Sequence, residues 1–376
     1  MSFISIGKID KSHIPLLIGC VFCFLNRLLN QYDGTLLFKN VIITNIVISF
    51  SRIFALLPHI ILKIRTKRET VNNKNNNINI QNDLYLYTDN EKKIIKGKFG
   101  FIIFSAVIFF IQSILFLSSL QIKVNSWILY ILGASIFSYI IFKDKLYKHH
   151  YLSIILIILI GVVIDLVLET LQYDISNNLL QLLLRLLREI LFSFHHVIAK
   201  YIMEAKFVSV YEMTFYNGII NLILLGITFI FDYYYFKIDN YEEYFNNFNV
   251  KELLVVLGVM STQLGLNLSS LFTIRNNSAC HVFIMLAFGQ MAYLNISQDA
   301  VKVIICLIFI LFLTLIFNEI IEINFWGLSY NTKRNIIDRA ESKDEFNISM
   351  NETIDSSNDG DDEFVTETNT SEEIYN

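Results

Sequence analysis

The sequence predicts an all-α membrane protein that crosses the bilayer many times. Of its 376 residues, 54% are hydrophobic and only 17% are charged, which is too little charge to cover the surface of a water-soluble domain. The hydrophobic residues are gathered into runs of about 20, the length of a helix that spans the hydrocarbon of a bilayer. These runs are apolar on all sides and lack the alternating pattern of a membrane β-barrel.

Ten apolar segments are long enough to be transmembrane helices. Their predicted bounds are 13–32, 39–64, 98–120, 125–142, 151–171, 179–204, 208–235, 251–274, 277–297 and 301–322. The first segment follows the polar stretch Lys8–His13, so we expect it to stay in the protein as an anchor and not to be cleaved as a signal peptide. Residues 13–322 are therefore expected to form one ten-helix domain.

The positions of lysine and arginine predict how the domain is oriented. When successive loops are placed on alternate sides of the membrane, one side carries 21 basic residues and the other five. Basic residues accumulate in short cytosolic loops. We therefore expect both termini to be cytosolic, with residues 1–12 as a short N-terminal segment. The sequence does not identify the organelle, although an endomembrane is favoured over the plasma membrane.

Two segments fall outside the membrane unit. Residues 66–97 form an Asn- and Lys-rich loop, which we expect to be disordered in the cytosol because it has too few apolar residues to form a core. Residues 323–376 are predicted to be a cytosolic tail, largely disordered. From residue 340 onward this tail has twelve acidic residues and one basic residue, whereas the preceding 339 residues have 29 basic and 22 acidic residues. The net charge of -4 thus combines a basic membrane unit with an acidic tail.

The loop lengths suggest that the ten helices form two repeats of five. The longest loop of each predicted half follows its second helix, at 66–97 and at 236–250. Because five is an odd number, the second repeat would be inverted in the membrane relative to the first. This five-plus-five inverted repeat is a construction that places a binding site near the middle of the bilayer, between the two halves.

Ionisable side chains within a bilayer are costly unless they line water or find partners, so they mark candidate site residues. Segment 179–204 holds most of them, including Arg188, Glu189, His196 and Lys200. Glu189, His196 and Lys200 share one helix face by their three- and four-residue spacing, which predicts a polar stripe along a cavity. The alternative is that Lys200 extends to the interface and Arg188 pairs with an acidic residue for packing.

Segment 208–235 offers a second set, Tyr216 and Asn217. An aromatic ring beside an amide can stack on a planar ligand and hydrogen-bond to it. The alternative is a contact between the amide and a neighbouring helix.

The first two segments contribute Asn26, Arg27 and Arg52. An arginine within the membrane is a suitable partner for a phosphate or carboxylate group. Arg27 and Arg52 could equally pair with Glu189 or Asp165, so both interpretations stay open.

Segment 251–274 adds Gln263 and Asn267 as candidate cavity residues. Ser261, Gly265 and Ser269 recur at four-residue spacing in the same segment. Small residues at this spacing permit close helix packing, and that is the role we expect for them.

The sequence gives no support for catalysis, and we expect neither a cofactor nor a metal. Lipid desaturases need several histidine-rich boxes, whereas this chain has seven histidines in total and no HxxxH spacing. GxSxG, HExxH and P-loop patterns are also missing. Cys20 and Cys23 form a CxxC pair without a second pair, which favours buried packing over a metal site.

Two passages resemble the drug/metabolite transporter superfamily. They are GASIFSYIIFKDKLYKHHYLSIILIILIGVVI at 133–164 and EILFSFHHVIAKYIMEAKFVSVYEMTFYNG at 189–218. Together with the ten-helix plan, they look like the solute carriers that include EamA-type proteins and nucleotide-sugar transporters, over residues 13 to 335. Phe215, Tyr216 and Asn217 resemble the start of a Phe-Tyr-Asn-Asn nucleotide-recognition motif, but Gly218 replaces its second Asn. The Gly-Ala-Leu-Asn-Lys motif of GDP-sugar carriers has no match in RNNSACHVFIML at 275–286.

The resemblance implies a central cavity surrounded by the first four helices of each half, with the fifth and tenth helices at the periphery. It implies a secondary transporter that moves a small polar metabolite by alternating access. The alternative is a non-transporting scaffold or receptor of the same fold that uses the acidic tail for interactions. The partners expected are a small-molecule solute and the lipid bilayer; homodimer formation stays open, and nucleic acid is not expected.

Overall fold

The structure is a computed structural model of the chain, and its described part covers most of the membrane unit. The described residues are 4–6, 11–30, 41–61, 63–65, 97–118, 126–143, 146–167, 170–236, 241, 246, 248–290 and 300–323. The tail from 324 onward lies outside them, as does the Asn-rich loop except for residue 97.

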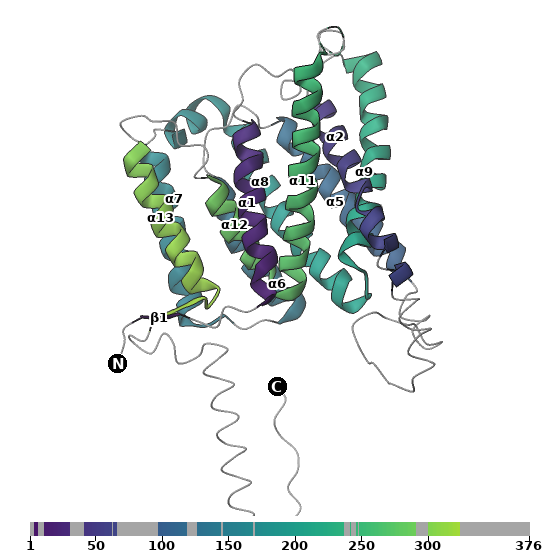
Figure 1. Ribbon diagram of the computed structural model, residues 1–376. Helices are drawn as coiled ribbons and strands as arrows, with labels where there is room; N and C mark the ends of the chain where they lie inside the picture. The colour runs from purple at the N-terminus through teal and green to yellow at the C-terminus, as the bar shows by residue number, and fades with distance from the viewer. Residues whose placement is uncertain are drawn as a thin grey trace, which may run out of the picture.

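Each of the ten predicted apolar segments contains an α-helix (Figure 1). The helices are α1 (Ile14–Asn30), α2 (Val41–Ile53), α5 (Lys98–Ser118), α6 (Leu129–Phe142), α7 (Lys148–Val167), α8 (Thr170–Ala205), α9 (Val210–Phe231), α11 (Val250–Asn276), α12 (Val282–Gln290) and α13 (Ala300–Phe317). Short 3-10 turns precede three of them, namely η1 (Lys11–His13), η3 (Ser126–Ile128) and η5 (Ala279–His281), and a π-helical turn, η4 (Asp232–Phe236), extends α9.

Six helical stretches of the described chain are long and apolar enough to cross a membrane by length and composition. They are Lys11–Leu29, Ile42–Arg65, Lys98–Leu115, Lys148–Leu166, Val210–Tyr234 and Val250–Asn276. Three further apolar helices are shorter: Ser126–Phe142, Ala279–Gln290 and Ile304–Phe317. The long helix α8 is not among the six and carries the charged residues Arg185, Arg188 and Glu189 in its middle.

The distribution of side chains is that of a protein whose outer face meets lipid. Large aliphatic residues such as Ile155 on α7 and Phe309 on α13 are exposed, while charged and amide side chains such as Arg52, Glu189 and Asn221 are buried. A water-soluble protein has the opposite arrangement, because burying polar groups in place of apolar ones is costly. Composition, helices and burial together indicate a multi-pass membrane protein of the all-α class.

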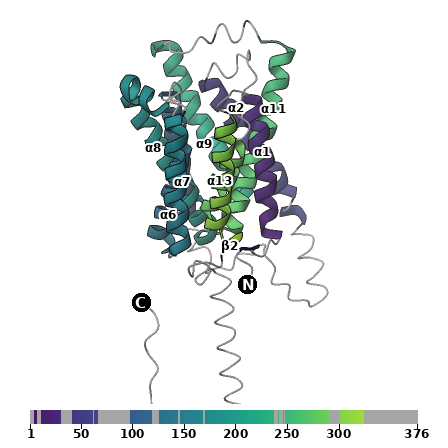
Figure 2. The same ribbon diagram turned by 90° about the vertical axis from the view of Figure 1, so that its left-hand side faces the viewer.

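The helices run roughly parallel and pack in a recurring set of pairs (Figure 1). α1 packs against α11 and α12, α8 against α5 and α6, α5 against α9, and α11 against α2. α2 packs against α9, and α7 packs against α13. Figure 2 shows α7 and α13 side by side on one flank of the bundle.

Glycine permits two of the closest helix contacts. A Cβ atom added to Gly265 of α11 would lie 2.5 Å from the Phe22 ring of α1, and one added to Gly218 of α9 would lie 2.9 Å from the backbone oxygen of Ser49 in α2. The expected role of Gly265 in close packing is therefore confirmed. Gly218, which interrupts the Phe-Tyr-Asn-Asn pattern, is required by the contact between α9 and α2.

Two short strands join the ends of the helical unit. β1 (Ile4–Ile6) pairs with β2 (Ile321–Ile323) in antiparallel register, with Ser5 opposite Glu322. The chain that enters α1 and the chain that leaves α13 thus lie at the same end of the bundle (Figure 2). The apolar pattern predicts a helix that includes Ile321, whereas in the structure Ile321 begins strand β2.

The last helix ends earlier than predicted because its final turn closes on itself. The backbone N–H of Glu319 donates to the oxygen of Ile316, and that of Ile320 donates to the oxygen of Leu315. Glu319 has a left-handed backbone, with φ of 58°. These are the features of a Schellman helix end, so α13 stops at Phe317 and the chain becomes extended.

Candidate functional site

The most polar group in the interior is centred on Arg52. Arg52 lies in the last turn of α2 and is 5% exposed. Its terminal nitrogen Nη2 donates to the side-chain oxygen of Asn267 on α11 at 3.1 Å, and its Cζ lies 3.8 Å from the centre of the Phe109 ring on α5. The guanidinium is thus held between an amide on one side and an aromatic face on the other, in a cation–π contact. We call Arg52, Asn267 and Phe109 the Arg52 group.

Helix α9 reaches the same level of the bundle through Gly218. A Cβ atom at this position would lie 2.8 Å from the Cβ of Arg52. Asn217 and Asn221 flank Gly218 on α9, and both are buried. The side-chain nitrogen of Asn221 donates to the backbone oxygen of Asn217 at 2.7 Å. This bond does not use the side-chain oxygen of either asparagine.

Several buried polar atoms on these helices make no hydrogen bond within the described residues. Among them are Oγ of Ser49 and Nε of Arg52 on α2, Oε1 of Gln112 on α5, Oδ1 of Asn217 and of Asn221 on α9, and Nδ2 of Asn267 on α11. Buried polar groups are nearly always hydrogen-bonded, and a group without a protein partner usually bonds to water or a ligand. The four helices α2, α5, α9 and α11 therefore carry the donors and acceptors of a polar site.

Helix α8 approaches α5 through His195. Its Nδ1 lies 3.2 Å from the hydroxyl of Ser105 and 3.2 Å from the backbone oxygen of the same residue. The imidazole ring is 5.5 Å from the Phe109 ring, centre to centre, so His195 lies beside the Arg52 group. Sequence analysis did not choose His195, Phe109 or Gln112. A glutamine and serines within the apolar segment 98–120 were the available signal.

The predicted polar face of α8 is divided among three separate networks. His196 belongs to the first. Its Nδ1 lies 2.8 Å from the hydroxyl of Tyr130 on α6, and that hydroxyl donates to the backbone oxygen of Ala279 at 2.9 Å. A phenol has one proton, so Tyr130 accepts from Nδ1–H of His196. This chain of bonds joins α8, α6 and η5.

Glu189 has its counter-charge on its own helix. Nη1 of Arg188 donates to Oε1 of Glu189 at 3.0 Å, and Nε of Arg185 lies 4.0 Å from the same oxygen. Arg185 also donates to the hydroxyl of Ser126, which ties the middle of α8 to η3. The arginines that pair with Glu189 are therefore neighbours on α8.

Lys200 lies at a helix end. Its Nζ donates to the backbone oxygen of Asn277 at 2.9 Å and lies 3.7 Å from Glu204 and 5.3 Å from the centre of the Phe142 ring. A cation near the last carbonyl groups of a helix is favourable, and here it joins the end of α8 to the end of α11. The structure does not bring Lys200 together with the Arg52 group.

The remaining predicted residues lie on α1, α9 and α11, and most of them contact a neighbouring helix. The side-chain oxygen of Asn26 accepts from the hydroxyl of Thr262 at 3.4 Å. Arg27 packs against α12, because a Cβ atom added to Gly289 would lie 3.6 Å from Cγ of Arg27. Tyr216 makes an edge contact with Phe99 on α5, 5.8 Å between ring centres. Gln263 is half-buried on α11.

Comparison with protein-family models gives no match, and a search among curated proteins finds no significantly similar sequence.

Proposed function

We propose that the chain is a secondary transporter that moves a small anionic metabolite by alternating access, in the manner of the drug/metabolite transporter superfamily. The observation that carries the proposal is the Arg52 group. It puts a buried cation and several buried amide and hydroxyl groups, whose hydrogen-bonding capacity is only partly used, at the contact between the first five helices and the last five.

The helix packing supports a repeat of five helices. In the proposed correspondence each helix of the first half has a counterpart five helices later: α1 with α8, α2 with α9, α5 with α11, α6 with α12 and α7 with α13. Exchanging every helix for its counterpart turns the α1–α11 contact into α8–α5, α1–α12 into α8–α6, and α5–α9 into α11–α2, all of which are present. The α2–α9 and α7–α13 contacts map onto themselves. Packing of this kind is expected of two repeats related by a two-fold axis.

The strand pair supports an even number of membrane crossings. Because β1 and β2 pair at one end of the bundle, the chain enters and leaves the helical unit on the same side. Ten crossings in two inverted sets of five satisfy this condition, and the bias of basic residues favours the cytosol for that side.

The chemistry of the Arg52 group favours an anion over a neutral solute. A guanidinium makes its strongest hydrogen bonds with carboxylate and phosphate groups. In a bilayer interior such an ion is costly unless it is paired, and Arg52 has an amide in place of an acidic partner in the contacts described above. A bound anion would supply the missing charge.

The bond between Arg52 and Asn267 also joins the two halves, since α2 belongs to the first and α11 to the second. Binding of an anion at Arg52 would compete with this bond. It would thereby couple occupation of the site to movement of one half relative to the other, which is the requirement for alternating access.

The test measures exchange of solute across the membrane of proteoliposomes that contain the full chain. The proteoliposomes are preloaded with carboxylates, phosphate esters or neutral sugars. We expect exchange of one anion class, and loss of that exchange in Arg52→Gln. The matched control is Arg65→Gln, because Arg65 follows the same helix but is exposed. Exchange of neutral solutes alone, or equal exchange by Arg52→Gln and wild type, would refute an anion site at Arg52. Complete lack of exchange in folded wild type, with a partner bound through residues 340–376, would favour the scaffold.

A further inference from the structure

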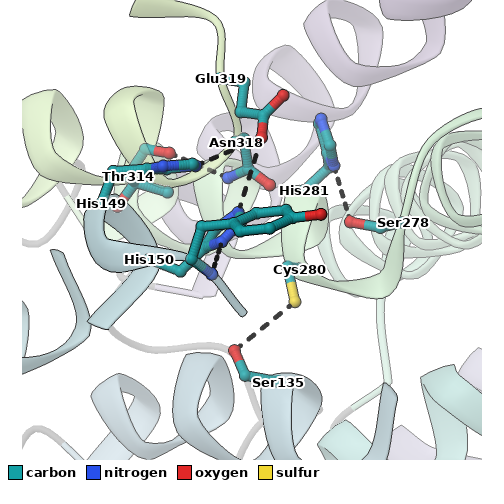
Figure 3. Close-up of polar contacts among 10 residues, drawn as sticks. Ser135, His149, His150, Ser278, Cys280, His281, Thr314, Asn318 and Glu319 are labelled. Atoms are coloured by element: carbon teal, nitrogen blue, oxygen red, sulfur yellow. Dashed lines mark hydrogen bonds and ion pairs between the residues drawn. The ribbon is translucent and has the colours of Figure 1, made fainter. Parts of the chain in front are cut away.

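A second polar cluster, in which one residue is buried and two are half-buried, lies far from Arg52 in sequence, where α7 begins and α13 ends. His149 and His150 occupy the first turn of α7, and Glu319 follows the last turn of α13. Figure 3 shows the two imidazole rings and the carboxylate converging from the two helices. One ligand atom from each residue can be chosen so that all three lie within 4.8 Å of one another.

The distances lie on either side of the separation expected for two ligands of a single ion. Nε2 of His149 lies 3.2 Å from Oε1 of Glu319, and Nε2 of His150 lies 3.9 Å from the same oxygen. Zinc binds imidazole nitrogen and carboxylate oxygen at about 2.0 to 2.2 Å in tetrahedral geometry, which separates neighbouring ligand atoms by roughly 3.3 to 3.6 Å.

His149 provides an independent indication of a ligand. The residue is 3% exposed, yet within the described part of the chain neither of its ring nitrogens makes a hydrogen bond. Nε2 is close enough to Glu319 for a bond, but the direction of the ring does not give N–H···O geometry. A nitrogen and an oxygen that lie this close without a hydrogen bond are compatible with two ligands of a third atom.

The backbone at Glu319 adds to this arrangement. Glu319 is the left-handed residue of the Schellman turn, with φ of 58°, a position that glycine normally occupies because it has no Cβ. Glutamate here keeps a carboxylate at the end of α13, directed at the start of α7.

We propose that His149, His150 and Glu319 form a Zn²⁺ site that ties α7 to α13. Three protein ligands and one water would complete a tetrahedral shell. Imidazole and carboxylate together suit a borderline divalent ion such as zinc better than Mg²⁺ or Ca²⁺, which prefer all-oxygen shells.

The two histidines would contribute unequally. Nδ1 of His150 accepts a hydrogen bond from the backbone N–H of Tyr147 at 2.9 Å, so neutral His150 carries its proton on Nε2. Coordination through Nε2 requires that proton to move to Nδ1 and the bond from Tyr147 to open. His149 has no such bond to lose, so His149 and Glu319 are expected to contribute most of the affinity.

The test measures Zn²⁺ bound to the purified full chain, after removal of any affinity tag and dialysis against a chelator. We expect one Zn²⁺ per chain, no binding of Mg²⁺ at the same concentration, and a higher melting temperature with zinc. His149→Ala and Glu319→Gln should weaken binding by more than about 100-fold, because loss of a ligand exceeds the 10- to 100-fold effect of losing a ligand's supporting partner. His150→Ala should weaken it less.

The control is His281→Ala, since His281 lies nearby on η5 and bonds to Ser278 at 2.8 Å without joining the cluster (Figure 3). Melting temperatures in chelator establish that each variant is folded. The proposal is overturned if wild type binds no more zinc than His149→Ala and Glu319→Gln, or if His281→Ala loses as much binding as they do. Transport does not enter the measurement, so its outcome is separate from that of the proposed function.

Discussion

The α2–α9 contact and the α7–α13 contact would each join a helix to its counterpart in the proposed repeat, but the two contacts differ in chemistry. Beside α2–α9 lie Arg52, Asn217 and Asn221, all buried. Along α7–α13 the middle of each helix is apolar, and in α7 the charged and imidazole side chains lie within the first and last turns, at Lys148, His149, His150 and Asp165. In the proposed repeat, equivalent contacts would therefore serve different purposes: the inner, α2–α9 contact would supply polar groups for the proposed site, and the outer, α7–α13 contact supplies mainly packing.

The largest expected effect on stability is at the outer contact. Ile157 on α7 is fully buried, so Ile157→Ala should leave a cavity and lower the free energy of unfolding by about 3 kcal/mol. Because Ile157 is a core residue of the cluster that includes Ile310 of α13 and has no polar group to offer a solute, the exchange rate per folded molecule should stay unchanged. Thermal unfolding in detergent and exchange in proteoliposomes measure the two quantities. The control is Ile155→Ala on the exposed face of the same helix; equal destabilisation by both substitutions would contradict the packing described for α7.

The next largest effect is at the inner contact. Gly218→Ala would place a Cβ 2.8 Å from the Cβ of Arg52 and 2.9 Å from the oxygen of Ser49, so the α2–α9 contact must open. We expect a loss of about 2 kcal/mol from overpacking, together with reduced exchange per folded molecule.

Gly226 is the matched control for Gly218 on the same helix. A Cβ added there has no atom within 4 Å, so Gly226→Ala should be neutral or should stabilise α9 by up to about 1 kcal/mol, since alanine is the better helix former. Thermal unfolding of the two variants in parallel distinguishes the close contact from a general effect of alanine. Similar melting temperatures for both would contradict it.

The smallest expected effect is at the end of α13. Glu319→Gly should relieve the left-handed strain and raise the free energy of unfolding in chelator by about 1 kcal/mol. In the presence of zinc the variant should be less stable than wild type, because it lacks a ligand for the ion. Lys143→Gly is the control, since Lys143 has the same left-handed backbone after α6, with φ of 57°, and is not one of the three proposed ligands. A zinc response that is the same in Glu319→Gly and wild type would exclude Glu319 as a ligand.

Much of the helical framework follows from the apolar pattern alone, because a run of about 20 apolar residues has few alternatives to a helix in a bilayer. Helix ends were predicted less well. α8 begins at Thr170 and not at 179, since Asp174 and the neighbouring amides do not interrupt the helix. α13 ends at Phe317 because its carbonyls are satisfied by a Schellman turn, for which the sequence has glutamate in place of the usual glycine.

The candidate site could be predicted only in part. The polarity of Arg52 and Asn267 within apolar segments identified both as candidates, but their bond joins residues 215 positions apart, and periodicity contains no information about such pairs. For the same reason the spacing of polar residues on α8 predicts one continuous polar stripe. The helix spacing places His196 and Lys200 on one face of α8. In the structure they belong to separate networks, because His196 bonds to Tyr130 of α6 and Lys200 bonds to Asn277 at the end of α11.

Ligand-dependent thermal unfolding of wild type and Arg52→Met measures whether Arg52 binds an anion. A ligand at 100 times its dissociation constant stabilises a protein by about 2.7 kcal/mol. We predict that one class of carboxylate or phosphate raises the melting temperature of wild type and not that of Arg52→Met. Without ligand the variant should be at least as stable, because an incompletely bonded buried charge has been removed. An equal ligand response in both proteins, or stabilisation of wild type by neutral solutes only, would contradict the account.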